Sequence, residues 1–116
     1  MTNRDQVFKR YNLDKKKSYS VDEISKITSF KKSDLYQVKK RGEGAWKTNI
    51  ESVRLKGSFK KDPSAPRSAK LSPEQWGWAR LFAFINKIDK AIESRNPTID
   101  QDCDIARKYL PNIKCK

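Results

Sequence analysis

The pattern of hydrophobic and polar positions is most regular between Leu71 and Glu93, where it predicts a long central helix. Ser72 is a suitable N-cap, and Gln75 completes an S-x-x-Q capping box with it. Apolar residues then recur at helical spacing; they are Trp78, Leu81, Phe82, Ile85, Ile88 and Ile92. A helix that is apolar over so much of its surface must be buried on more than one side. We therefore expect the rest of the chain to pack around residues 73–93.

Two shorter helices are predicted upstream, at 20–28 and 31–41. Ser20 and Glu23 form a capping box for the first, whose buried side would hold Val21, Ile24 and Ile27. Leu35 and Val38 mark the buried side of the second, and Gly42 is placed as its C-terminal stop. Two short helices joined by a tight turn resemble a helix-turn-helix, whose second helix reads DNA. An ordinary helical hairpin with a solvated basic side would give the same pattern.

The stretch from Gly42 to Lys61 has a different character. It predicts an irregular segment, with a possible short β segment at 50–60. Trp46 and Phe59 stand among basic residues, an arrangement that suits stacking on bases next to phosphates. Both rings can also be core residues of a small domain, and this is the interpretation that we favour.

A last helix is predicted at 99–109. Thr98 and Gln101 form its capping box, and Pro111 prevents its continuation. The fold class expected from these elements is mainly α: a small single-domain helical bundle with a helix-turn-helix-like pair and a long central helix. We divide the chain into a basic N-terminal arm (1–18), a helical core domain (19–93), and a C-terminal helix with a tail (94–116).

Charge adds a functional hypothesis to this fold. The chain carries 27 Lys and Arg residues against 14 Asp and Glu, a net charge of +13. The excess is +4 in residues 1–18, +7 in 19–70 and only +2 in 71–116. Such a field attracts nucleic acid or acidic protein surfaces and, less favoured here, an anionic membrane surface, although it can also serve solubility alone. The candidate nucleic-acid-binding residues are Lys31, Lys32, Lys39, Lys40, Arg41, Lys47, Arg54, Lys56, Lys60 and Lys61.

Other functional classes find little support in the sequence. The chain has no histidine, so we expect neither an enzyme nor a metal site, and no motif indicates a cofactor or a small-molecule substrate. No apolar run is long enough to span a membrane, which predicts a soluble protein of a reducing compartment. Cys103 and Cys115 could pair if the tail folds back, but we expect free thiols.

The residues from Arg41 to Arg80 also carry a resemblance. RGEGAWKTN, SVRLKGSFKK and KLSPEQWGWAR, together with the upstream YSVDEISKIT, resemble a family of small basic proteins of large double-stranded DNA viruses and some tailed phages. The match covers roughly residues 19–90 and brings no catalytic residues. It implies a non-enzymatic viral protein, found in the virion and during assembly in the host cytoplasm or nucleus. Its partner would be nucleic acid. Alternatively, it would be a minor capsid protein that bridges larger capsid proteins by binding their acidic surfaces.

Overall fold

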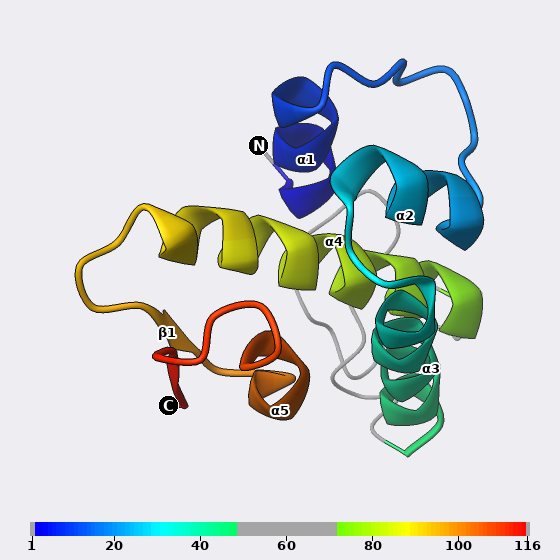
Figure 1. The fold of residues 1–116 in the computed structure, drawn as a ribbon. Helices are drawn as coiled ribbons and strands as arrows, with labels where there is room; N and C mark the ends of the chain where they lie inside the picture. Colours follow the sequence, from blue (N-terminus) through cyan, green and yellow to red (C-terminus); the bar gives the residue numbers. More distant parts are fainter. Residues whose placement is uncertain (1, 49–71, 116) are drawn as a thin grey trace.

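The protein is mainly helical, as the sequence predicts. A computed structural model describes residues 2–48 and 72–115. Its elements are α1 (Asn3–Arg10), α2 (Val21–Thr28), α3 (Lys32–Thr48), α4 (Pro73–Ile92), β1 (Thr98–Ile99), α5 (Cys103–Ala106) and β2 (Lys114–Cys115). Helices α1 and α2 lie on one side of α4, and α3 and the C-terminal elements lie on the other (Figure 1). Within the described ranges, every helix is too short or too polar to cross a membrane.

The predicted central helix is confirmed as α4. The Ser72 hydroxyl accepts a hydrogen bond from the Gln75 backbone N–H at 3.2 Å, and the Gln75 side chain accepts one from the Ser72 N–H at 2.9 Å. Leu81, Ile85 and Ile88 are fully buried, and burying each such side chain is worth roughly 1.5–3 kcal/mol. The packing of the other helices is therefore organised by α4. Its last residue, Ile92, was expected on the buried side but is 60 % exposed, because the last turn of α4 extends past the helices that cover it (Figure 1).

Part of the expected N-terminal arm belongs to the core. The Thr2 hydroxyl accepts a hydrogen bond from the Asp5 N–H at 3.0 Å and starts α1. Val7 and Phe8 are buried, and the Phe8 ring meets Phe82 of α4 edge-on at 5.7 Å. The lysines at 15–17, in the later part of the arm, are exposed. The first part of the predicted arm is thus a helix of the core, because the two apolar residues of α1 are buried.

A buried polar cluster fixes the position of α1 on α4. The amide nitrogen of Asn86 donates to the side chains of Asn3 at 2.8 Å and Gln6 at 3.0 Å. Its oxygen accepts from the guanidinium of Arg10 at 3.1 Å. Asn86 is only 1 % exposed, so a shifted helix would leave these polar atoms buried without partners.

Helix α3 is longer than predicted. It continues through Gly42 and Gly44 to Thr48, so the expected stop at Gly42 is wrong. Gly42 is buried against Gly77 of α4: a Cβ on Gly42 would lie 2.8 Å from the Gly77 Cα, and one on Gly77 would lie 2.8 Å from the Lys39 carbonyl oxygen. Gly42 therefore allows two helix backbones to approach, and it does not end α3. The expected irregular segment is wrong for residues 42–48; the β segment at 50–60 lies outside the described residues.

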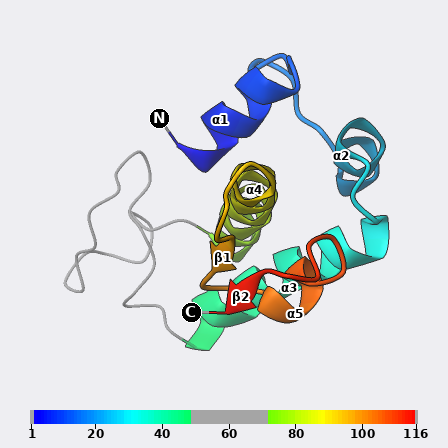
Figure 2. The same ribbon diagram turned by 60° about the vertical axis from the view of Figure 1, so that its left-hand side comes forward.

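The C-terminal segment also departs from the prediction. Instead of a helix over 99–109, a short helix, α5, lies between β1 and β2, which pair in parallel (Figure 2). Ile99, Ile105 and Ile113 are buried and draw the chain back on itself. This return brings Cys103 and Cys115 into a disulfide, with Cα atoms 5.7 Å apart. The expectation of free thiols is therefore wrong, because the tail folds back.

Candidate nucleic-acid interface

The predicted binding residues divide between two faces of α3. The structure describes Lys31, Lys32, Lys39, Lys40, Arg41 and Lys47, whereas Arg54, Lys56, Lys60 and Lys61 lie outside the described residues. Leu35 and Val38 are fully buried and define the inward face of α3, towards α4. All six cations are predicted from the sequence to bind nucleic acid. The helix instead separates them by direction.

Two of these cations point inward and take part in the fold. The Lys39 ammonium lies 3.1 Å from a carboxylate oxygen of Glu43 and 5.6 Å from the centre of the Trp78 ring. The Arg41 guanidinium donates to Asp102 at 3.0 Å and to both carboxylate oxygens of Asp104 at 2.8 and 2.7 Å. These contacts lower the pKa of Asp104 to about 2, with the hydrogen bond from Arg41 as the main cause. Lys39 and Arg41 therefore hold the fold and are poorly placed to bind phosphate.

Asp102 was not recognised from the sequence as a structural residue. Its side chain is 1 % exposed and accepts hydrogen bonds from Arg41 and from Arg80 of α4, each at 3.0 Å. Its backbone is left-handed, with φ of 57°, a conformation that Asp and Asn tolerate better than most residues. One carboxylate therefore ties α3, α4 and the start of α5 together. Within the described ranges, no group of three or more Asp, Glu, Cys or His side chains could hold a metal ion.

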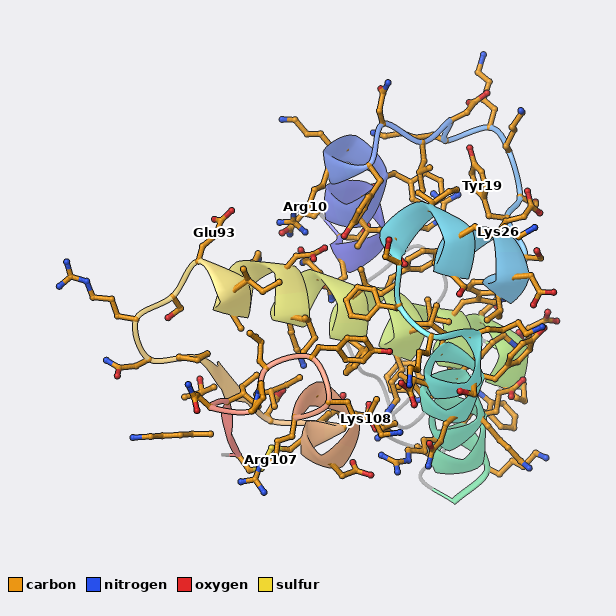
Figure 3. All side chains as sticks on the ribbon, viewed as in Figure 1. Arg10, Tyr19, Lys26, Glu93, Arg107 and Lys108 are labelled. Carbon is orange, nitrogen blue, oxygen red and sulfur yellow. A yellow bond between two sulfur atoms is a disulfide. The ribbon has the colours of Figure 1, made fainter. Side chains whose placement is uncertain are left out.

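The C-terminal segment also anchors the start of α3. Asp34, which is buried, accepts hydrogen bonds from the Lys108 ammonium at 2.9 Å and the Tyr109 hydroxyl at 2.7 Å. Burial alone would raise the pKa of Asp34, but these hydrogen bonds outweigh it and the pKa is lowered. Burial and the bond to Asp34 raise the pKa of Tyr109 to about 12. In Figure 3, Lys108 lies between α5 and α3, whereas Arg107 points away from the body of the molecule.

The outward face of α3 is a solvent-exposed surface. Its residues are Lys32, Ser33, Tyr36, Gln37, Lys40, Gly44 and Lys47, and all are exposed. Among the described residues, Lys40 and Lys47 make no ion pair, whereas Lys32 lies 3.8 Å from Asp22 of α2. Lys31 precedes this face and is also exposed. We refer to this set, with Lys31, as the outward face. Its chemistry suits phosphate and hydrogen-bonding groups, because it carries both cations and uncharged polar side chains.

Comparison of the chain with protein-family models, with curated proteins and with solved structures finds no match. The resemblance to a family of viral proteins therefore stays a prediction. Trp46, for which we favoured core packing over stacking, is half-buried. The geometry and charge of α3 are what the structure contributes to a functional interpretation.

Proposed function

We propose that the protein is a non-catalytic nucleic-acid-binding protein that contacts phosphates through the outward face of α3. The observation that carries this proposal is the sorting of charge on one helix. Lys39 and Arg41 are engaged by carboxylates, while Lys31, Lys40 and Lys47 are exposed. Lys31 interacts electrostatically with Asp34, but Lys40 and Lys47 make no ion pair with a described carboxylate. Such cations keep their attraction for a polyanion, and binding to phosphates releases condensed counterions.

The acidic residues support the same proposal by their positions. Asp89, Asp100 and Asp102 are each bonded to a basic side chain of the fold. Asp5 and Glu23 accept hydrogen bonds at the starts of α1 and α2. Among the described residues, most carboxylates are thus already bonded to a basic side chain or a backbone N–H, and exposed basic side chains outnumber exposed acidic ones.

The test is a binding titration of the full chain with a labelled 20-base-pair duplex at several salt concentrations. Each neutralised phosphate contributes about −0.9 to the slope of log K against log salt. Three to four contacts on the outward face therefore predict a slope of about −3 to −4. Absence of binding at low salt, or binding that does not weaken as salt increases, would contradict the proposal.

An acidic protein surface, as on a larger capsid subunit, is the second candidate partner. It is favoured by exposed cations on other sides of the molecule, such as Arg95, Arg107 and Lys114. Polyglutamate added as a competitor separates the two candidates. If polyglutamate displaces the duplex at equal charge concentration, the surface recognises charge alone and an acidic protein becomes the better partner. A location in the virion is likewise proposed, and detection of the chain in purified particles of its source virus would test it.

A further inference from the structure

The connection between α2 and α3 has a defined length and conformation. Helix α2 has eight residues and ends at Thr28. Ser29 then adopts the left-handed conformation, with φ of 67° and ψ of 9°, and only Phe30 and Lys31 separate it from α3. A three-residue turn between a short helix and a longer one is the connection found in a helix-turn-helix. The two helices run in clearly different directions in both views of the fold (Figures 1 and 2).

Hydrogen bonds and core aromatics hold this turn in place. The Ser25 hydroxyl donates to the Phe30 carbonyl oxygen at 2.6 Å. The Lys31 backbone N–H donates to the Tyr109 hydroxyl at 2.9 Å. The Phe30 ring is buried and meets the Tyr109 ring at 4.7 Å. The orientation of α3 relative to α2 is thus fixed before any ligand arrives, which lowers the entropic cost of binding a duplex.

The exposed residues at the start of α3 carry hydrogen-bonding groups as well as charge. Ser33, Tyr36, Gln37 and Lys40 follow one another along the outward face, and Tyr36 is 50 % exposed. The first residues of a recognition helix are those that meet base edges in the major groove. Glutamine can pair with adenine, lysine with guanine, and serine with either. Uncharged donors can also contact phosphates, so it is the position of Ser33 and Gln37 at the start of α3 that points to the bases.

We propose that α2 and α3 form a helix-turn-helix that reads base pairs in the major groove of duplex DNA, with Ser33, Gln37 and Lys40 facing the bases. This inference rests on the proposed function and narrows its partner to sequence-specific duplex DNA. An α-helix about 10–12 Å wide fits the major groove, which is about 12 Å wide. Asp22 lies beside this face, accepting a hydrogen bond from the Tyr36 hydroxyl at 3.2 Å. Its charge opposes phosphate, so Asp22→Asn should strengthen binding to every duplex alike.

The experiment is a selection by the full chain from a library of duplexes with 20 randomised base pairs, followed by sequencing. We expect a short motif to be enriched. Gln37→Ala should then weaken binding to the selected duplex about tenfold, the usual effect of losing one good base contact, and leave binding to a scrambled duplex unchanged. Gln101→Ala, a change at another exposed glutamine, is the matched control and should leave both affinities unchanged.

The outcomes separate this inference from the proposed function. Salt-dependent binding of the library without any enriched motif would overturn the helix-turn-helix inference and leave phosphate binding standing. A selected motif that Gln37→Ala and Ser33→Ala do not affect would also overturn it. No binding of any duplex would overturn both. The side chains of Ser33 and Gln37 are exposed, so we expect both variants to fold. Circular dichroism of each variant checks this.

Discussion

The inward and outward faces of α3 both carry basic side chains, but they use them differently. On the inward face, Arg41 is held by Asp102 and Asp104, and Lys39 by Glu43. On the outward face, Lys40 and Lys47 are exposed and pair with no carboxylate of the described residues. Net charge alone therefore does not define a binding surface. Partners inside the fold decide which cations remain for a ligand, and the following predictions test that division.

The largest contrast is expected between two residues that lie two positions apart. Leu35→Ala removes a fully buried side chain from the inward face and should lower the free energy of unfolding by about 2–5 kcal/mol. Gln37→Ala changes an exposed residue of the outward face and should stay within about 0.5 kcal/mol of wild type. Urea denaturation followed by circular dichroism measures both. Equal losses would mean that α3 has no distinct inward face.

The two glycines of α3 give the next contrast. Gly42→Ala places a methyl group 2.8 Å from the Gly77 Cα and should destabilise the fold by about 1–3 kcal/mol through overpacking. Gly44→Ala meets no described atom within 4 Å and should stabilise the fold by up to about 1 kcal/mol through helix propensity. Thermal melting of both variants shows whether each substitution raises or lowers the stability of the fold. If Gly42→Ala were stabilising, the close approach of α3 and α4 would be wrong.

The ion pair between Arg41 and Asp104 should make a smaller contribution to the free energy of unfolding, and this contribution should be lost as the pH falls. The pKa of Asp104 is lowered to about 2 in the folded protein, from an ordinary value of 3.8. The folded state therefore binds this proton less readily than the unfolded state. The stabilisation is complete above about pH 5 and is lost as the pH falls from about 4 towards 2.

The variant Asp104→Asn should reduce this acid dependence of the free energy of unfolding. Glu93→Gln, at the exposed end of α4 (Figure 3), serves as the control and should leave the dependence unchanged. Denaturation curves between pH 2 and pH 7 compare the variants. A wild-type profile that Asp104→Asn does not alter would show that Arg41 and Asp104 are not paired in solution.

Much of the helical fold could be predicted because its signals are local. The capping boxes at Ser20 and Ser72 form as expected, since each depends on residues three positions apart. The start of α1 was missed because Asp5 takes the place that Glu or Gln usually holds in a capping box. The extension of α3 was missed because Gly42 packs against Gly77, a residue 35 positions away, and does not end the helix.

The candidate site was only partly predictable for the same reason. Lys39 follows Leu35 by four residues, so helical spacing alone places it beside the inward face. The partners of Arg41, in contrast, come from a segment about 60 residues later that folds back through buried isoleucines and the Cys103–Cys115 disulfide. Sequence patterns identified the cations, but only the structure shows which of them are paired.

Substitutions of exposed lysines on the outward face should change stability least, and they test DNA binding by this face most directly. The double variant Lys40→Ala/Lys47→Ala is compared with Lys90→Ala/Lys114→Ala, which changes two exposed lysines outside α3, one in the last turn of α4 and one in β2. Both variants lower the net charge by two, and neither should change the unfolding midpoint appreciably. The measurement is the slope of log K against log salt for a 20-base-pair duplex. We predict that the slope becomes shallower by about 0.9 for each lost contact in the α3 variant and stays at the wild-type value in the control. Equal changes in the two variants would contradict the account, because binding would then follow net charge and not the outward face of α3.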